Sequence, residues 1–347
     1  MTLLIDAQDL TGLISTNDAV DIVRKGFFDQ GNSPSFSAPK VRIQHQDRRL
    51  TVHPGGCPSL KISGMFIHAE RFTFTGNAQQ YNRAGRRVYV AYDSETAELK
   101  AIIIGSLPLF EFDTLEESYG TETAITSAVG TDLLARDNSE VLGLLGTGLQ
   151  ARRHLFMMCQ IRPIKEVRVY SRNEENRSKF VHQMQKFVQA SLQVVGDPRE
   201  AVKGADLICC ATNTNVPALC GQWLEPGQHV TSIVNSNKGV KEQAGLAKPR
   251  REIDDEVVRR ADLILVNIRE QSLLEEHGDL CEPIEKGITS WNKISEIGEI
   301  LNGRAEGRTS EKQISLFKQN SDQGVGFMAL AKLVYQIAEG EGIGIQV

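Results

Sequence analysis

Apolar residues recur along the chain with two different spacings, which divide it into regions of different predicted structure. Between residues 13 and 30 they lie three and four positions apart, which predicts an amphipathic helix capped by Ser15, Thr16 or Asn17. From about residue 40 to 105, short β-rich runs separated by turn residues predict a mostly antiparallel sheet. These runs are 40–43, 50–53, 61–68, 87–92 and 100–104.

The second half of the chain alternates apolar strands with helices. A helical stretch at about 115–135 leads into the fully apolar run 141–145, after which the pattern predicts helices at 152–160 and 177–190. Such alternation is typical of a parallel sheet covered by helices on both faces. The tail, residues 314–347, is predicted to form one long helix after a glycine-containing turn at 322–326, and this helix is expected to pack back on the N-terminal region. Further apolar strands are predicted at 167–170, 205–211, 229–234 and 261–266.

Composition narrows the class of protein. A chain of 347 residues is natural for two domains, and 40% hydrophobic with 24% charged residues is typical of a globular protein. The net charge of -5 comes from well-mixed charges, so neither nucleic acid nor a membrane is expected as a partner. No run approaches the roughly 20 apolar residues that span a bilayer, and no secretion signal is recognised. None of the six cysteines forms a CxxC pair, which favours reduced thiols and a cytoplasmic protein, and no metal site is predicted.

A glycine-rich motif, Gly-x-Gly-x-x-Ala at residues 146–151, directly follows the apolar run 141–145 and opens a predicted helix. The first glycine permits a tight turn, the second lets the backbone approach a pyrophosphate, and Ala151 keeps helix and strand close. The amino end of the helix supplies N–H groups and partial positive charge for the phosphates. The sequence therefore predicts an α/β fold with a Rossmann doubly wound parallel sheet that binds NAD(P), with a ligand-free tight turn as the alternative. The residues expected at the pyrophosphate are Gly146, Thr147, Gly148, Leu149 and Gln150.

The end of the second predicted strand of this sheet bears on which cofactor binds. An NAD enzyme usually places an acidic residue about 20 residues after the glycines to hold the ribose hydroxyls. Here the run 167–170 is followed by Ser171, Arg172 and Asn173, with no acid before Glu174. Ser171 can hydrogen-bond a 2′-phosphate and Arg172 can pair with it, so the sequence favours NADP(H) over NAD(H). An arginine at this place is also compatible with a solvated loop.

Polar residues also follow the next two predicted strands. In open parallel sheets, ligands bind outside the carboxyl ends of the strands. The polarity of ordinary loops explains such residues equally well. The residues expected to line the cofactor there are Thr212, Asn213, Thr214, Val234 and Asn235.

Several segments together resemble the ornithine cyclodeaminase/μ-crystallin family. The most specific stretch is 124–172, with Ala-Ile-Thr-Ser-Ala at 124–128, the glycine motif, and Val-Arg-Val-Tyr-Ser-Arg at 167–172. The resemblance runs over nearly the whole chain. Its other matches are 211–213 with Pro217, 223–229, 278–280, 307–308 and 316–318.

The resemblance implies a two-domain subunit that forms a homodimer. A substrate-binding and dimerisation domain of the α+β type is expected from residues 1–125 with 315–347, and the NAD(P)-binding Rossmann domain from 126–314. Members of the family reduce imines, dehydrogenate amino acids, or cyclise ornithine with release of ammonia. All of these reactions pass a hydride to or from C4 of the nicotinamide, so the expected substrate is a small imine or amino-acid-like molecule.

Two expected substrate positions depart from the family pattern. Glu122 stands where the resemblance expects an arginine for the substrate carboxylate, and Phe66 aligns with a lysine that hydrogen-bonds the substrate. Lys61 and His68 lie close to Phe66 in sequence and can supply a shifted donor. An arginine of the first β-run persists as Arg42.

The replacements suggest new roles, each with a simpler alternative. Glu122 is expected to bind a substrate amine or protonate an imine nitrogen, because a dry pocket favours the protonated carboxyl group; capping a helix is the alternative. His68 alternates with Glu70 on one strand face and is a candidate proton donor, unless that face is simply solvated. The resemblance places His53 near the substrate. The predicted residues are thus Glu122 and His68 for catalysis and Arg42, His53, Lys61 and Phe66 for substrate binding, with Asp279 structural.

Three functional hypotheses remain open. The first is an NAD(P)H-dependent oxidoreductase acting on a C–N bond, either an imine reductase or an amino-acid dehydrogenase. The second is an ornithine cyclodeaminase-like ammonia lyase that uses NAD catalytically, which would release ammonia without a net change in nicotinamide absorbance. The third is a μ-crystallin-like protein that binds NADP and a small ligand without turnover.

Overall fold

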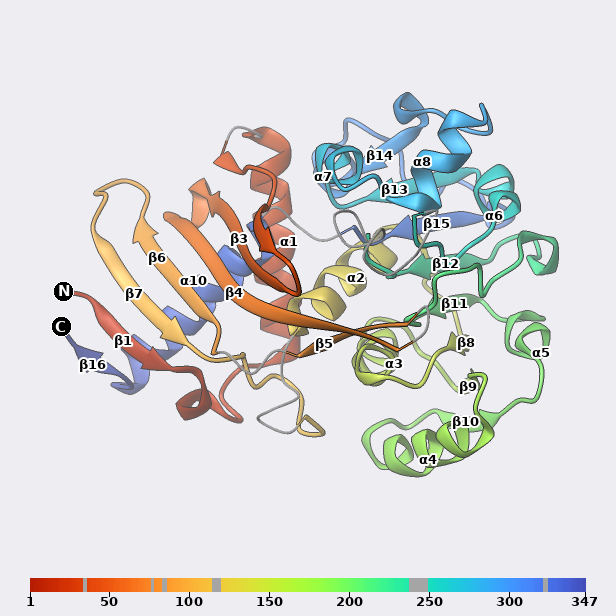
Figure 1. The fold of residues 1–347 in the computed structure, drawn as a ribbon, viewed down its shortest axis with the longest axis horizontal. Coiled ribbons are helices and arrows are strands. Elements are labelled where there is room, and N and C mark those ends of the chain that lie inside the picture. The colour runs from red at the N-terminus through yellow and green to blue at the C-terminus, as the bar shows by residue number, and fades with distance from the viewer. Residues whose placement is uncertain (34–35, 76–77, 83–85, 114–119, 237–248, 321–323) are drawn as a thin grey trace. The chain divides into compact units, whose positions relative to one another are not determined.

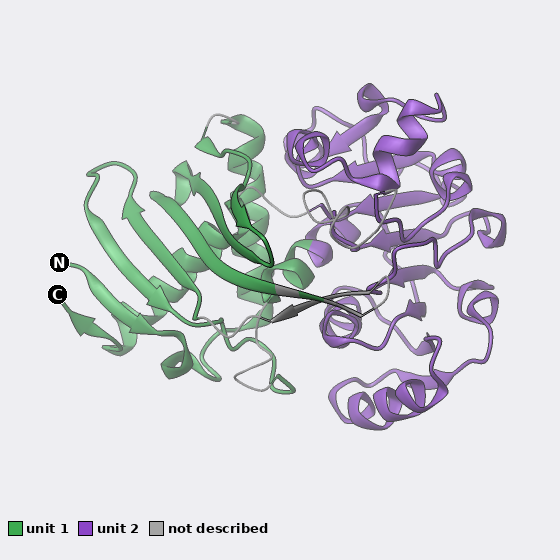
Figure 2. Ribbon diagram, viewed as in Figure 1, with its two compact units in different colours: residues 1–126, 322–347 green, residues 127–321 purple. Residues whose placement is uncertain are grey.

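The computed structural model describes residues 1–347 except 34–35, 76–77, 83–85, 114–119, 237–248 and 321–323. The chain forms two compact units (Figure 2): residues 1–126 with 322–347, here called unit 1, and residues 127–321, here called unit 2. Each unit is organised around one sheet of eight strands. The predicted fold class, a parallel α/β sheet with a second α+β unit, is confirmed.

The sheet of unit 1 has the strand order β16-β1-β7-β6-β4-β3-β2, with β5 paired to β4. Its strands pair antiparallel, apart from the parallel pair β1 and β7, so the predicted antiparallel sheet is confirmed. Burial alternates along β3, because successive side chains of a strand point to opposite faces. The strands are β1 (Leu3–Asp6), β2 (Val41–His45), β3 (Arg48–Cys57), β4 (Ile62–Thr75), β5 (Ala78–Asn82), β6 (Val88–Asp93), β7 (Leu99–Ile104) and β16 (Ile345–Gln346).

Two helices, α1 (Thr16–Asn32) and α10 (Val325–Glu341), pack on one another and against one face of this sheet (Figure 1). As predicted, Ser15 caps α1, and its side chain accepts a hydrogen bond from the backbone N–H of Asp18 at 3.5 Å. The two helices approach closely at Gly26, where a Cβ atom would lie 3.2 Å from the Ala329 Cβ. A small residue at this position therefore lets the helices pack tightly.

The sheet of unit 2 has the order β10-β9-β8-β11-β12-β15-β13-β14, and each described pair of neighbours runs parallel. Strands β11 and β12 are buried at every residue, and β11 accordingly reads as a fully apolar run in the sequence. The chain order reverses between β8 and β11, which makes this the topological switch point of the sheet. The strands are β8 (Val141–Leu145), β9 (Glu166–Tyr170), β10 (Ser191–Val194), β11 (Leu207–Cys210), β12 (His229–Ser232), β13 (Leu263–Val266), β14 (Ile294–Glu296) and β15 (Ser315–Lys318).

Helices connect these strands in the manner of a doubly wound sheet (Figure 1). The α-helices are α2 (Thr121–Leu134), α3 (Leu149–Ile161), α4 (Glu174–Met184), α5 (Pro198–Val202), α6 (Asp255–Arg260), α7 (Arg269–Leu274), α8 (Gly278–Glu285) and α9 (Ile297–Leu301). Short 3-10 helices lie at η1 (Ala7–Leu10), η3 (Pro58–Leu60), η4 (Gln185–Phe187), η5 (Gly221–Trp223) and η6 (Trp291–Lys293).

The long C-terminal helix predicted after the turn at residues 322–326 is confirmed as α10, which covers Val325–Glu341. The residues before that turn add an element that was not predicted: Ser315–Lys318 forms β15, which lies between β12 and β13 in the sheet of unit 2. Unit 1 accordingly resumes at residue 322, whereas residues 315–347 were expected in it. A short apolar run has no period that separates a buried strand from a helix, so the spacing alone did not identify this strand.

All six cysteines are free thiols, as the sequence predicted. No helix in the described part of the chain combines the length and the apolarity needed to cross a bilayer.

Candidate functional site

The predicted phosphate-binding turn lies at the switch point of unit 2, between the carboxyl end of β8 and the amino end of α3. Gly146 has φ of 125°, and a Cβ atom there would lie 2.2 Å from the carbonyl oxygen of Ala211, so a residue with a side chain does not fit. Its N–H donates to the carbonyl oxygen of Tyr170 at 2.8 Å, which ties the turn to β9. The turn is therefore fixed by its own backbone.

The space in front of α3 suits a pyrophosphate. Gly148 is the N-cap of this helix, and no atom of the described residues lies within 4 Å of the place where its Cβ would be. Without a capping side chain, the first N–H groups of α3, beginning at Leu149 and Gln150, point toward this open space. Backbone donors and the helix dipole at such a terminus stabilise an anion. The predicted motif thus has the geometry that a dinucleotide requires.

The carboxyl end of β9 holds the residues predicted to contact the ribose. Thr147 Oγ1 donates to Ser171 Oγ at 3.2 Å, and Ser171 Oγ donates to the carbonyl oxygen of Asn173 at 3.2 Å. Arg172 is exposed to solvent beside them. Arg177, which the sequence analysis missed, donates from Nη1 to the Ser171 carbonyl oxygen at 2.6 Å. Two guanidinium groups therefore flank the end of this strand.

The loops after β11 and β12 contain the other predicted cofactor residues. Thr212 is held by Glu252 through its N–H and its hydroxyl, at 2.8 and 2.6 Å. The N–H of Val234 donates to the other oxygen of Glu252 at 3.0 Å. Asn213 and Asn235 are exposed, and Thr214 donates to the carbonyl oxygen of Val216 at 2.7 Å. One buried carboxylate thus fixes the ends of two adjacent strands.

Glu252 belongs to a buried ionic network directly behind these loops. Lys318 Nζ lies 2.9 Å from Asp279 Oδ2, and both side chains are fully buried. Ser232 donates to Glu252 Oε2 at 2.9 Å and also receives a hydrogen bond from Lys318 Nζ at 3.2 Å. Burial raises the pKa of Glu252, while Lys318 opposes that rise. The structural role expected for Asp279 fits this network, which anchors the cofactor edge from within.

The sequence analysis missed Glu252 and Lys318. A weak signal existed for Lys318, since a lysine that ends a fully apolar strand must find a partner inside the protein. For Glu252 no local signal existed, because its partners lie 18 to 40 residues away in the sequence.

A second buried group supports the turn from the side of α3. His154 Nδ1 lies 2.7 Å from the carbonyl oxygen of Gln150, and its Nε2 lies 2.9 Å from Ser127 Oγ. Burial lowers the pKa of His154 to about 4, so the ring is neutral at physiological pH. The neutral ring connects α2 to the first turns of α3.

The predicted substrate residues lie on the inner face of the sheet of unit 1, in rows that cross its strands. His53 of β3 pairs in register with Phe66 of β4. In the next row, Arg42 of β2 lies opposite Thr51, which lies opposite His68. Four of the predicted residues, Arg42, His53, Phe66 and His68, are therefore brought to one part of one face.

Aromatic contacts fix the row that contains His53 and Phe66. The Phe66 ring stacks on Phe327 of α10 with centroids 4.2 Å apart, and His53 lies 4.8 Å from the same ring. Phe66 is 4% exposed and contacts Tyr89 at 4.7 Å. Phe66 thus occupies a packed aromatic cluster.

Two predicted residues lie apart from these rows. Lys61 precedes β4, its side chain is 58% exposed, and its ammonium group pairs with Glu95 at 2.9 Å. Glu122 lies in the first turn of α2 and is half-buried. The structure therefore does not bring Lys61 to the group formed by Arg42, His53, Phe66 and His68.

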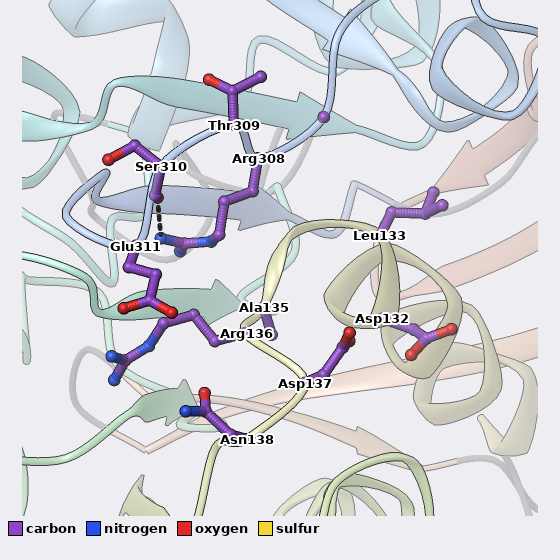
Figure 3. A pocket seen from close by; sticks show the side chains of 11 residues that line it. Asp132, Leu133, Ala135, Arg136, Asp137, Asn138, Arg308, Thr309, Ser310 and Glu311 are labelled. Carbon is purple, nitrogen blue, oxygen red and sulfur yellow. Dashed lines mark hydrogen bonds between the residues drawn. The ribbon is translucent and has the colours of Figure 1, made fainter.

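A pocket of about 530 Å³ lies elsewhere in unit 2 (Figure 3). It is formed by residues that precede β8 and β15, so it lies at the amino ends of the parallel strands. Arg308 crosses it and donates from Nε to the carbonyl oxygen of Leu134 at 2.6 Å. Because dinucleotides bind at the carboxyl ends, this pocket is not the cofactor site. Its lining residues are Asp132, Leu133, Ala135, Arg136, Asp137, Asn138, Gly307, Arg308, Thr309, Ser310 and Glu311.

Comparison with known proteins identifies the family. The sequence profile of the ornithine cyclodeaminase/mu-crystallin family matches residues 118–342, which is more than half of the chain. The chain belongs to this family. The predicted resemblance is thereby confirmed.

Relatives of this family member include enzymes from distant organisms. Delta(1)-pyrroline-2-carboxylate reductase of Bacillus cereus is 32% identical over 234 residues, which are 66% of this chain and 68% of the relative. Ketimine reductase mu-crystallin of Mus musculus is 35% identical over 214 residues, 61% of this chain and 60% of the relative. The structure of Thermococcus litoralis Delta(1)-pyrroline-2-carboxylate reductase, in complex with NADH and L-proline, covers the whole of both chains with a TM-score of 0.80 and 25% identity.

This member of the family contains no metal site in the part that the structure describes, where no group of three or more His, Cys, Asp and Glu side chains is placed to hold an ion. Its cofactor edge has the open helix terminus and the polar strand ends that a dinucleotide needs. The sheet face that carries the predicted substrate residues has Phe66 where the resemblance led us to expect a lysine, with His53 paired to it across the strands.

Proposed function

We propose that the chain is an NAD(P)H-dependent oxidoreductase that acts on a C–N bond, as an imine reductase or amino-acid dehydrogenase. The observation that carries this proposal is the backbone-built anion site at the switch point, around Gly146 and Gly148, in a chain of this family. Relatives named as ketimine and pyrroline-2-carboxylate reductases support the same reaction class. The bound cofactor would exchange a hydride with the α-carbon of the substrate.

The residues of unit 2 would hold the cofactor in a fixed pose. The N–H groups at the start of α3 bind the pyrophosphate, and the loops pinned by Glu252 line the part of the cofactor beyond it. A site whose donors are already immobilised loses little entropy when its ligand binds.

We further propose a preference for NADP(H). Ser171 and Arg172 follow β9, and Arg177 adds a second guanidinium group at the same strand end. A 2′-phosphate carries negative charge that such groups bind with charge-assisted hydrogen bonds. NAD(H) would leave them without this partner.

The substrate is proposed to carry a carboxylate. Arg42 shares a row with His68, and Arg49 lies one row further along the same face, so this face presents mainly positive groups. A guanidinium group binds a carboxylate in bidentate fashion. Glu122, in the first turn of α2, is the proposed contact for the substrate nitrogen.

We also propose that the chain forms a homodimer through the outer face of the sheet in unit 1. Val41, Ile43 and Leu50 lie on this face and are 55%, 66% and 38% exposed. Apolar side chains gathered on an open sheet face mark a surface for association. Replacing Ile43 with Lys should turn a dimer into a monomer in light scattering, and a parent protein that is already monomeric would contradict the proposal.

A panel of cyclic and open keto acid–amine imines, each mixed with NADPH or NADH, tests the proposed reaction. We expect at least one imine to oxidise the cofactor with one equivalent of amine formed. Release of ammonia from a diamino acid, with no net change in nicotinamide absorbance, would instead identify a cyclodeaminase. Tight NADPH binding without turnover of any imine would identify a ligand-binding protein.

A further inference from the structure

Two histidines and an ion pair form a continuous series of polar contacts on the inner face of the sheet in unit 1. His53 Nε2 and His68 Nε2 lie 3.4 Å apart, with ring centroids 5.5 Å apart. The other nitrogen of His68, Nδ1, lies 3.4 Å from Glu70 Oε1. Glu70 Oε2 accepts hydrogen bonds from Arg49 Nε and Nη2 at 3.1 and 2.6 Å. These four residues, Arg49, Glu70, His68 and His53, are called the histidine relay below.

We propose that the histidine relay holds one exchangeable proton and delivers it to the nitrogen of the substrate. This inference rests on the proposed function. His68 Nε2 would donate the proton to the imine nitrogen, and the reduced nicotinamide, when bound, would supply a hydride with its two electrons to the imine carbon. The C=N bond would thereby become CH–NH, and the relay would regain its proton from solvent.

The contacts determine which nitrogen carries the exchangeable proton. Glu70, whose side chain is 1% exposed, is kept ionised by the Arg49 guanidinium and can then only accept hydrogen bonds. Its negative charge, 3.4 Å from His68 Nδ1, electrostatically favours a proton on that nitrogen, which leaves His68 Nε2 facing His53 Nε2. An added proton enters between these two nitrogens. Two positive rings at this distance would repel, so the pair takes up one proton rather than two.

Exposure distinguishes the donor from the groups behind it. The side chain of His68 is 15% exposed, against 1% for Glu70 and 5% for Arg49, and His53 is 4% exposed. His68 is thus the member placed to touch a substrate, and the other three are positioning residues. At 3.4 Å its contact with His53 is longer than a normal hydrogen bond, so a substrate nitrogen can compete for the proton.

The free energy of burying charged groups indicates that the histidine relay does not serve to stabilise the fold. The neighbouring part of the same face is apolar, with Ile5, Ala91 and Ile103 fully buried. A buried ion pair is no more stabilising than apolar residues of similar volume, because its desolvation offsets its Coulomb attraction. A function accounts for retaining charged groups at this place.

Charged and titratable groups surround the histidine pair from each neighbouring element. Arg42 approaches along its row from β2, Arg49 lies on β3, Glu70 on β4 and Tyr89 on β6. From α10, the apolar ring of Phe327 covers His53. The positive charges of the two arginines oppose proton uptake by the histidine pair, and the Glu70 carboxylate favours it. Replacing Glu70 should therefore lower the proton affinity of the pair, and replacing Arg42 should raise it by a smaller amount.

The first test needs no activity. In protein labelled with 15N in histidine, we expect nuclear magnetic resonance to show His68 with its proton on Nδ1 and the pair binding one proton over the range from pH 4 to 9. His45, exposed on β2, supplies the reference signals of a solvent-exposed ring. The variant Glu70→Gln should lose the Nδ1 preference. Uptake of two protons by His53 and His68, each independently of the other, would overturn the relay.

The second test measures imine reduction as a function of pH. His68→Gln should lower kcat by about 10²- to 10⁴-fold, as expected when a general acid is removed, while NADPH affinity changes less than twofold. Glu70→Gln should move the alkaline limb of the pH profile about one unit lower, because a stabilising negative charge is lost. The exposed control His45→Gln should leave the profile unchanged.

The outcomes separate this inference from the proposed function. Imine reduction by His68→Gln at the rate of the parent protein would refute His68 as donor while leaving the reductase function intact. A parent protein that binds NADPH but reduces no imine would refute the reductase function. In that case the resonance titration alone decides whether the two histidines share a proton.

Discussion

The two units of this chain build their candidate sites from different parts of the polypeptide. In unit 2, the cofactor edge is made of backbone N–H groups at a glycine turn, fixed from behind by Glu252, Asp279 and Lys318. In unit 1, the substrate face is made of side chains that meet across neighbouring strands, above all His53 and His68. Backbone donors suit the diphosphate of a cofactor that stays the same whichever substrate is used. Side chains can be substituted without altering the fold, so members of a family can differ in substrate through such substitutions.

This difference predicts that substitutions in unit 2 will affect stability and cofactor binding together, whereas replacing His68 in unit 1 will affect catalysis with little loss of stability. The variant His68→Gln described above tests the second half of that statement. The following predictions test the first half, beginning with the largest expected effect.

Lys318→Met should lower the free energy of unfolding more than any other substitution proposed below. It leaves Asp279 in the interior with its ionic partner removed, and loss of one partner from a buried pair costs about 3–5 kcal/mol. The free energy of unfolding from urea denaturation measures this. Adding Asp279→Asn should recover part of the loss, because the unpaired charge is then gone. A change in the free energy of unfolding below about 1 kcal/mol would show that the ion pair between Lys318 and Asp279 contributes little to stability.

Acid should destabilise unit 2 through His154. Its pKa is about 4 in the folded protein against a usual value of 6.5, so the unfolded chain binds a proton that the folded protein excludes. The free energy of unfolding therefore falls as pH decreases from about 6.5 to about 4, by about 3 kcal/mol in all. Burial also lowers the pKa of His229, which adds to the same trend.

The variant His154→Gln isolates this contribution. Its melting temperature should depend less steeply on pH between 6.5 and 4 than that of the parent protein, with the remaining slope due in part to His229. Identical slopes for the two proteins would show that His154 titrates in the folded state.

Gly146→Ala should weaken cofactor binding and lower stability. The new Cβ would meet the Ala211 carbonyl oxygen, and the positive φ adds strain of roughly 1–3 kcal/mol. Calorimetric titration with NADPH and a thermal melt measure both effects. Gly196→Ala is the matched control, since nothing lies within 4 Å of its Cβ position. Equal affinities for the two variants would contradict a phosphate site at this turn.

Arg172→Asp should have the smallest and most selective effect. A carboxylate beside Ser171 repels a 2′-phosphate, so the Kd for NADPH should rise at least about tenfold, whereas that for NADH should change little. Comparing the two titrations checks the proposed cofactor preference. Unaltered NADPH affinity would place the 2′-phosphate elsewhere.

The inner sheet face of unit 1 shows how much of the candidate substrate site could be predicted from the sequence. Alternation along the predicted strand placed His68 and Glu70 on one face, and the structure has them there. Lys61 was an alternative donor because it precedes Phe66 closely in sequence, yet it lies before the strand and pairs with Glu95 in solvent. The contact between His53 and His68 could not be read from the sequence, because it depends on the register of β3 against β4.

The sequence by itself determined the elements whose signal is local: the Ser15 cap, the apolar strand β8 and the glycine turn at Gly146. These depend on residues a few positions apart, whose steric and hydrogen-bonding needs are visible in the chain. Only the tertiary structure decided that Ser315–Lys318 is a strand in the middle of the parallel sheet, and that Glu252 fixes the ends of two strands. Those outcomes depend on which distant residues exclude water together, and no local pattern records that.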